Sequence, residues 1–149
     1  FMDKKRMSNF DKDESSMLTS RRYYQCKEND AGIPTHAHTD YGLLTLAISD
    51  QPGLEVLKNV DWIAAPCGTP LPRFYVNVGD WLLFQLNNKA FIPGIHCVPN
   101  VMAQRFSVLL FLNPDNNDSI ETTNGMGTFQ QYAQQRSIYR RDLEVIDLK

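Results

Sequence analysis

The sequence has no long hydrophobic run and almost no excess of charge, with a formal net charge of -2 over 149 residues. A helix that crosses a bilayer needs about 20 consecutive apolar residues, and no stretch of the chain approaches that length. A nearly neutral chain also lacks the basic surface that attracts nucleic acid or anionic membranes. We therefore expect neither a nucleic-acid partner nor a membrane partner, and the oligomeric state stays open.

Cysteine is also scarce. The three cysteines, Cys26, Cys67 and Cys97, form an odd and widely spaced set, which matches neither a disulfide framework nor a zinc site. The first residues lack the apolar core of a secretory signal peptide. These features predict free thiols in a reducing compartment, and hence a cytoplasmic protein.

Helical periodicity is missing from most of the chain. Instead, nine short stretches rich in β-branched and aromatic residues alternate with turn-forming Pro, Gly, Asn and Asp. These stretches are residues 20–26, 35–42, 43–49, 53–58, 61–66, 73–79, 81–87, 94–99 and 105–113. Short strands at this spacing, without helices between them, are typical of an antiparallel sandwich or barrel.

The two ends of the chain depart from this pattern. In residues 128–146 apolar side chains mostly recur every three or four positions, and Thr128 with Gln131 has the spacing of a capping box. This predicts one C-terminal helix on the outside of the β-structure. Residues 1–17 are polar and of mixed charge, and we interpret them as a weak helix, a disordered leader or the remnant of an N-terminal region. Residues 18–149 would then form one domain.

The chain has three histidines, and two of them lie in the segment "PTHAHTDYG" (34–42). In a strand, His36, His38 and Asp40 would face one side, because residues two apart point the same way. Residues two apart are roughly 6.6 Å from each other and residues four apart roughly 13 Å, at ~3.3 Å per residue. One metal ion with bonds near ~2.1 Å can be bound from positions i and i+2. The metal-binding pair is therefore either His36 and His38 or His38 and Asp40.

The third histidine, His96, precedes an apolar strand that carries Arg105 and Ser107. Taken alone, His96 would be a core histidine, and Arg105 would form a structural ion pair, for example with Asp80. In a strand, however, Arg105 and Ser107 face the same side, and a buried arginine needs an anion because an unpaired buried charge is very costly. A guanidinium binds a carboxylate through two parallel hydrogen bonds, and a serine hydroxyl can add a third.

Such a set of side chains has a known chemistry. Two histidines and one carboxylate on one face of a metal leave open positions, as in non-haem iron(II) oxygenases. A 2-oxo acid can occupy two of these positions and dioxygen the third, while a more distant cation holds the far carboxylate of the acid.

Four segments carry a resemblance to a known family: "HTDYGLLTL" (38–46), "VNVGDWLLFQLNN" (76–88), "IHCV" (95–98) and "RFSVLLFLNP" (105–114). Their order and spacing resemble those of the iron(II)/2-oxoglutarate-dependent dioxygenases, specifically the isopenicillin N synthase-like branch. The resemblance implies a mainly β fold, a double-stranded β-helix (jelly-roll) barrel with a C-terminal helix. Members of the family usually carry a comparable stretch before the first core strand, so we interpret the chain as either a fragment or a trimmed core.

For the metal, the resemblance implies that His38, Asp40 and His96 are the iron(II) ligands and form the catalytic centre. It leaves His36 outside this triad, and replacing that residue should matter least.

For the co-substrate, the resemblance implies that Arg105 and Ser107 hold the distal carboxylate of 2-oxoglutarate. Tyr24 falls where the family often has a tyrosine near the co-substrate, and Arg22 stands where many members have an asparagine. The implied reaction consumes dioxygen and 2-oxoglutarate, releases succinate and carbon dioxide, and hydroxylates, desaturates or cyclises a small organic molecule. The sequence does not specify that substrate.

Several other interpretations stay open. An oxidase of the same scaffold could keep Arg105 and Ser107 without using 2-oxoglutarate, and a truncated barrel could bind metal without catalysis. A cupin-like module would use His36 and His38 with a later histidine. A metallo-β-lactamase-type hydrolase would need a histidine directly after Asp40, where the chain has Tyr41.

Overall fold

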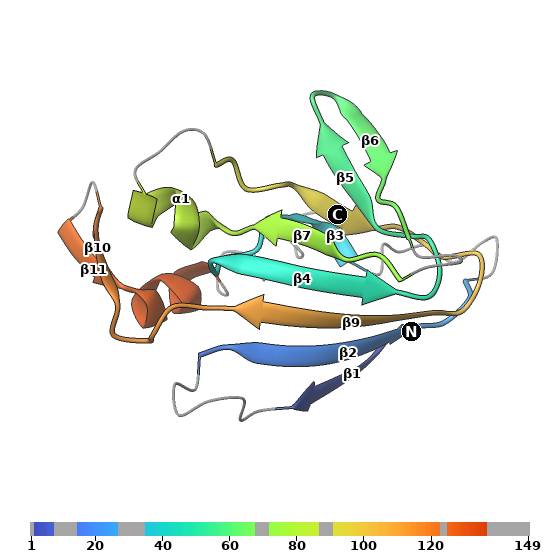
Figure 1. Cartoon of the computed structure of the whole chain (residues 1–149), viewed down its shortest axis with the longest axis horizontal. Coiled ribbons are helices and arrows are strands. Elements are labelled where there is room, and N and C mark those ends of the chain that lie inside the picture. The colour runs from blue at the N-terminus through green and yellow to red at the C-terminus, as the bar shows by residue number, and fades with distance from the viewer. Residues whose placement is uncertain are drawn as a thin grey trace, which may run out of the picture.

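A computed structural model of the chain describes residues 2–7, 15–26, 35–67, 72–86, 91–122 and 125–136. Two antiparallel sheets make up most of this part, with short helical segments at one end (Figure 1). In the described residues, no helix is both long and apolar enough to cross a membrane.

The larger sheet has five strands in the order β1-β2-β9-β4-β7, and every neighbouring pair is antiparallel. Its strands are β1 (Met2–Met7), β2 (Met17–Tyr23), β9 (Arg105–Leu112), β4 (Leu44–Ser49) and β7 (Tyr75–Val78). The central strand β9 pairs with two strands that lie far before it in the sequence. The sheet therefore depends on long-range pairing, as expected for a jelly roll.

The smaller sheet has four strands in the order β3-β8-β5-β6. They are β3 (Thr35–His38), β8 (His96–Val98), β5 (Glu55–Lys58) and β6 (Asp61–Ala64). The pair β5–β6 is a hairpin that projects from the body of the molecule (Figure 1). Its turn includes Asn59 at a positive φ of 59°, a conformation that asparagine tolerates better than most residues.

Aromatic residues form a buried cluster at the end of the larger sheet. Trp81 is 1% exposed and Phe129 3% exposed, and their rings meet edge to face with centroids 5.3 Å apart. Tyr132 packs against Trp81 and against Phe84. This cluster fixes the helix of residues 129–136 against α1 (Asp80–Leu86).

The helix α1 corrects one of the sequence predictions, because residues 81–87 were expected to be a strand. A short apolar run cannot be distinguished from a buried helical segment by its periodicity. Trp81 and Phe84 are three positions apart, and both contact Tyr132 of the C-terminal helix. Tertiary packing on one helical face therefore decides the conformation of this segment.

Residues 2–7 are neither a helix nor a disordered leader, although they can still belong to the remnant of an N-terminal region. Residues 2–7 form β1, which pairs with β2 from Met2 opposite Tyr23 to Met7 opposite Leu18. A polar segment can extend a sheet because the ladder is made of backbone hydrogen bonds. Two further strands that the sequence did not predict, β10 (Ser119–Thr122) and β11 (Gly125–Thr128), form a separate pair.

The predicted C-terminal helix is present in residues 129–136, and the remainder of its predicted span, 137–146, lies outside the described residues. Its capping box is confirmed. The backbone N–H of Thr128 donates to Oε1 of Gln131 at 3.0 Å, and the backbone N–H of Gln131 donates to Oγ1 of Thr128 at 3.3 Å. These two bonds satisfy donors that a helix start leaves unpaired.

Candidate metal centre and anion site

His38, Asp40 and His96 lie together, with one possible ligand atom from each residue within 4.8 Å of the others. The two histidines are partners in the β3–β8 ladder, so their rings come to lie side by side with centroids 4.3 Å apart. β3 ends at His38, and Asp40 follows in the loop. A β-bulge before His38 shifts the register of this strand pair, a feature often found next to active sites.

The facing atoms of this triad leave a gap between them. Nε2 of His38 is 3.7 Å from Oδ1 of Asp40, and Nε2 of His96 is 3.7 Å from Oδ2 of the same carboxylate. These distances are too long for good hydrogen bonds. They suit ligands that share one metal ion with bonds near ~2.1 Å.

Backbone carbonyls orient both histidine rings. Nδ1 of His38 lies 2.7 Å from the carbonyl oxygen of His36, and Nδ1 of His96 lies 2.8 Å from that of Gly94. Because a carbonyl can only accept, these contacts favour a proton on each Nδ1, and in the neutral ring this leaves Nε2 with the lone pair that a metal needs. His36 thus contributes through its backbone, and its side chain does not join the triad.

Asn77 holds the carboxylate of the triad. Its side chain is 3% exposed, and Nδ2 donates to Oδ2 of Asp40 at 3.2 Å. Hydrogen bonds of this kind keep a ligand in position and commonly affect metal affinity. Asn77 lies in the segment "VNVGD", but its role was not predicted from the sequence.

Asp80 links the triad to the C-terminal helix. Its backbone N–H donates to the carbonyl of Asp40 at 2.8 Å, and its Oδ2 accepts hydrogen bonds from Thr39, Tyr132 and Arg136. Burial, and then the hydrogen bond to Asp80, raises the pKa of Tyr132 well above its ordinary value. The predicted alternative of an ion pair between Asp80 and Arg105 is not formed, because Asp80 pairs with Arg136 at 2.8 Å.

A close backbone approach makes this arrangement possible. A Cβ atom at Gly79 would lie 2.2 Å from the carbonyl oxygen of Gly42, so no larger residue fits there without a shift. The same carbonyl accepts a hydrogen bond from the backbone of Trp81 at 3.1 Å. The start of α1 is thereby fixed against the loop that carries Asp40.

The two sheets enclose a cavity with about 450 Å³ of space, including the part open to solvent. The triad lies in its wall together with polar and apolar side chains from both sheets. The other lining residues are Arg21, Tyr23, Thr35, Thr45, Ala47, Leu54, Tyr75, Val98, Arg105, Ser107, Leu109 and Phe111.

Arg105 enters this cavity as a buried cation, with 4% of its surface exposed. Its Nε donates to the carbonyl of Gln51 at 3.1 Å, and its guanidinium lies 5.1 Å from the centroid of the Tyr23 ring. Within the described ranges, no carboxylate forms an ion pair with it. Burial, which disfavours the charged form, lowers the pKa of Arg105.

Gly53 makes room for this arginine. It has a φ of 134°, which disfavours other residues, and a Cβ there would lie 3.2 Å from Cδ of Arg105. Ser107 lies two positions along β9 and is also 4% exposed. Its Oγ is buried without a hydrogen-bond partner among the residues described. An unpaired hydroxyl and a guanidinium without a counter-ion on one face suit a carboxylate.

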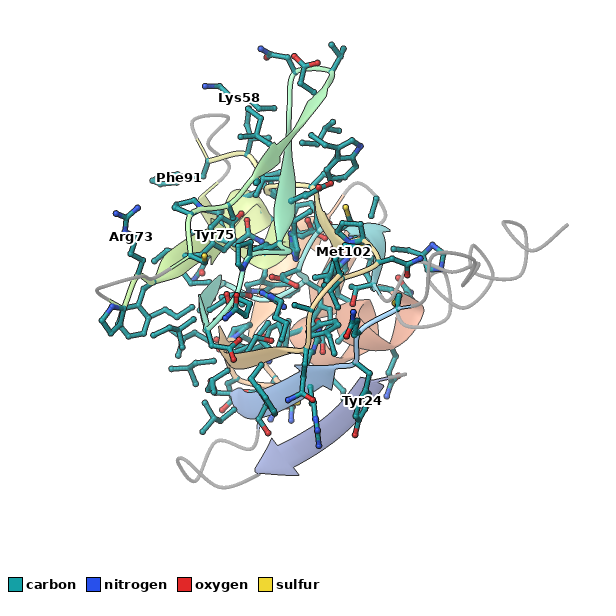
Figure 2. The ribbon with its side chains drawn as sticks, turned by 90° about the vertical axis from the view of Figure 1, so that its right-hand side faces the viewer. Tyr24, Lys58, Arg73, Tyr75, Phe91 and Met102 are labelled. Carbon is teal, nitrogen blue, oxygen red and sulfur yellow. The ribbon has the colours of Figure 1, made fainter. Side chains whose placement is uncertain are left out.

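Two neighbouring tyrosines on and after β2 have different surroundings. Tyr23 is 2% exposed and lines the cavity. Tyr24 is absent from the lining residues, and the guanidinium of Arg22 lies 4.6 Å from its ring centroid; Figure 2 shows it low in the view, beside β2. The predicted role of Tyr24 near a co-substrate therefore stays a prediction, and Tyr23 is the tyrosine of this pair that faces the cavity.

Arg21, which was not predicted as a site residue from the sequence, lines the cavity two positions before Tyr23. Side chains two positions apart in a strand face the same side, so knowing that Tyr23 faces the cavity would have predicted the same for Arg21.

Two tyrosines of the cavity wall, Tyr23 and Tyr75, have pKa values shifted in opposite directions. Burial raises that of Tyr23, but the nearby Arg21, Thr35 and Arg105 bring it below its ordinary value. Burial and then the negative charge of Asp40 raise the pKa of Tyr75.

The donor set suits a metal ion that keeps open coordination positions. Two imidazole nitrogens and one carboxylate oxygen, all on one side of a shared point, suit non-haem iron(II) and leave positions for other ligands. In the same cavity, Arg105 and Ser107 offer donors to an anion. The residues present therefore fit both an iron ion and a dicarboxylic 2-oxo acid.

The sequence is similar to those of curated dioxygenases. The chain is 36% identical over 115 residues to the 2-oxoglutarate-dependent dioxygenase frbH of Dothideomycetidae sp. (strain 11243), covering 74% of this chain and 35% of that protein. It is 31% identical over 109 residues to hyoscyamine 6-dioxygenase of Hyoscyamus niger, covering 70% of this chain and 30% of that protein. The chain thus spans about a third of the length of these curated relatives.

Solved structures support the fold. A full-length Neurospora crassa protein in complex with alpha-KG superposes with a TM-score of 0.68 at 25% identity, covering 81% of this chain and 44% of that chain. The same protein has been solved with alpha-KG and thymine. The predicted jelly-roll class is confirmed.

Residues 14–114 match the family described as the 2OG-Fe(II) oxygenase superfamily, and the chain belongs to this superfamily.

Proposed function

We propose that the chain carries the catalytic core of an iron(II)- and 2-oxoglutarate-dependent oxygenase that oxidises a small organic molecule. One observation carries the proposal: a single cavity contains the three candidate metal ligands together with the buried Arg105 and Ser107. We further propose that residues 18–149 form this core, to which β1 adds an edge strand.

In this proposal His38, Asp40 and His96 hold the iron, which supplies the activation of dioxygen when bound. The chain's own part is to prepare the ligands. The carbonyls of residues 36 and 94 keep both Nε2 lone pairs available, and Asn77 fixes the carboxylate. Ligands that are held in this way would need little reorganisation to bind the metal, which favours affinity.

Arg105 and Ser107 would bind the distal carboxylate of 2-oxoglutarate. Burial excludes water from this contact, so a charge-assisted hydrogen bond is stronger there than at the surface. In the overall reaction one oxygen atom of dioxygen enters succinate and the other enters the product or water, with loss of carbon dioxide. The side chains position the reactants and exclude water, while the metal carries the oxidative step.

The substrate belongs to the proposal only as a class. Two relatives are named for action on, or a complex with, small organic molecules, namely hyoscyamine and thymine. We propose a small-molecule substrate here too.

We also propose a cytoplasmic location, because Cys26, Cys67 and Cys97 are all free in the structure, as is usual in a reducing compartment.

The test is an anaerobic titration of the purified chain with iron(II) and then with 2-oxoglutarate. A visible charge-transfer band should appear only when both are present, and His96→Ala should abolish it. Failure of the wild-type chain to develop the band would contradict the proposal. Turnover with a substrate should form succinate; an active enzyme that forms none would be an oxidase of the same scaffold that does not use 2-oxoglutarate.

A further inference from the structure

A second arginine faces the cavity beside the proposed 2-oxoglutarate site. β2 and β9 are paired so that Arg21 lies opposite Ser107 and Tyr23 lies opposite Arg105. Residues opposite each other in an antiparallel pair project to the same face. All four side chains line the cavity that contains the metal triad, so the sequence prediction of one cation in this site was incomplete.

Arg21 has no counter-charge in the described part of the chain. None of the ion pairs there includes it, and its Nε is buried without a hydrogen-bond partner. Its guanidinium lies 6.0 Å from the centroid of the Phe111 ring and hydrogen-bonds to Tyr23. Buried and unpaired donors of a cation are costly, and an anion in the cavity would satisfy them.

The charges of the proposed complex indicate what that anion is. The two charges of iron(II) are matched by Asp40 and by the carboxylate of 2-oxoglutarate next to the metal. Arg105 would be matched by the far carboxylate, whereas no carboxylate of the described residues forms an ion pair with Arg21. One unmatched positive charge suits a carboxylate better than a phosphate monoester, which carries about -1.5 to -2 at pH 7.

We propose that Arg21 binds a carboxylate of the organic substrate, so that the enzyme oxidises a small organic acid. This inference rests on the proposed function, because it assigns 2-oxoglutarate to Arg105 and Ser107. Arg21 is then a binding residue that selects substrates by charge. The cavity would hold two carboxylate-bearing molecules, one at each arginine.

The next residue in the chain is a matched control. Arg22 lies on the opposite face of β2, where its Nη2 donates to Oε1 of Gln104 at 2.8 Å and its guanidinium lies 5.4 Å from the Phe106 ring centroid. Its Nε, like that of Arg21, is buried without a hydrogen-bond partner among the described residues, but Arg22 does not line the cavity, so position in the cavity distinguishes the two arginines. Arg21→Gln and Arg22→Gln therefore remove the same charge from the same strand, one inside the cavity and one outside.

The experiment measures binding to the chain loaded anaerobically with iron(II) and one equivalent of 2-oxoglutarate. The probes are benzoate and phenylacetate, each compared by calorimetry with its neutral amide. The wild-type chain and Arg22→Gln should bind the acids about tenfold or more tightly than the amides, as a charge-assisted bidentate contact predicts. Arg21→Gln should lose this preference, and Arg21→Lys should keep part of it.

Two results would overturn the inference. One is an equal affinity of the wild-type chain for acids and amides. The other is a loss of 2-oxoglutarate affinity in Arg21→Gln as large as in Arg105→Gln, which would make Arg21 part of the co-substrate site. The visible band with 2-oxoglutarate checks that each variant is folded and loaded. Its absence from the wild-type chain would instead contradict the proposed function.

Discussion

The metal side and the arginine side of the cavity differ in how their polar groups are satisfied. At the metal side, each histidine Nδ1 donates to a backbone carbonyl, and Asp40 accepts a hydrogen bond from Asn77. At the arginine side, Oγ of Ser107 and Nε of Arg21 are buried without partners among the described residues. One side is held in place by the protein, and the other offers donors that a ligand can use.

The electrostatic environment differs in the same way. The pKa of Tyr75 is raised by burial and by Asp40, whereas that of Tyr23 falls below its ordinary value because the arginines and Thr35 outweigh the effect of burial. The cavity is therefore negative near Asp40 and positive near Arg21 and Arg105. This polarity orients a 2-oxo acid with a metal at one end and a carboxylate at the other. Within this cavity, the satisfied groups belong to the candidate metal ligands, and the unsatisfied Arg21 and Ser107 offer donors to a ligand.

The largest expected effect is at the metal side. His38→Ala removes one of three ligands, and we expect metal affinity to fall by more than about a hundredfold, because even outer hydrogen-bond partners of ligands affect it by about 10–100-fold. His36→Ala is the control, since it keeps the backbone carbonyl that orients His38. Metal titration followed by cobalt(II) absorption measures both. Equal losses in the two variants would favour the cupin-like site instead.

The next largest effect is at the arginine side and should leave the metal side unaffected. Arg105→Gln removes the buried cation, and we expect the affinity for 2-oxoglutarate to fall by roughly 2–5 kcal/mol, as for other truncated buried charge pairs. Metal affinity without 2-oxoglutarate should be unchanged. The visible band, titrated with 2-oxoglutarate, gives the first quantity, and cobalt(II) binding gives the second. A parallel loss of both would mean that the two sides are not independent.

A smaller effect tests whether the metal side is prepared by its hydrogen bonds. Asn77→Ala leaves Oδ2 of Asp40 without its donor, and we expect metal affinity to fall about 10–100-fold. The apparent affinity of the metal-loaded protein for 2-oxoglutarate should stay nearly constant. Asn113→Ala, which removes an amide that donates to the carbonyl of Ser15, controls for general loss of stability, measured by thermal unfolding.

The sequence was sufficient to predict that His38, Asp40 and His96 lie together, but not all of their surroundings. His38 and Asp40 lie in one short segment, so local spacing restricted their geometry, and the family resemblance added His96. The face of β2 was harder to predict. In "RRYY" (21–24) each residue type is doubled, and a shift of one position leaves the pattern almost unchanged. The choice between Tyr23 and Tyr24 therefore depends on pairing with β9, which is a tertiary property.

Two other departures from prediction have a similar origin. The apolar segment that became α1 fits either a strand or a helix, and its contacts with Phe129 and Tyr132 select the helix. β1 is polar and pairs through its backbone at the sheet edge, so composition gave no signal for it. In contrast, the capping box of Thr128 and Gln131 depends on residues three apart, and the sequence predicted it correctly.

The smallest expected effect gives the sharpest contrast, because its sign differs between stability and binding. Ser107→Ala removes a buried hydroxyl that has no partner in the described structure. Without ligand, the free energy of unfolding should be unchanged or rise by up to about 1 kcal/mol, because burying an unsatisfied polar group is costly. With 2-oxoglutarate the Ser107 hydroxyl would have an acceptor, so the same variant should bind 2-oxoglutarate about 1 kcal/mol more weakly.

Ser49→Ala is the control. Its hydroxyl already donates to the carbonyl of Gln51 at 3.1 Å, so its removal should not increase stability. Thermal unfolding and the 2-oxoglutarate titration measure the two quantities; a Ser107→Ala variant that is both less stable and unchanged in affinity would show that this hydroxyl serves the fold rather than the ligand.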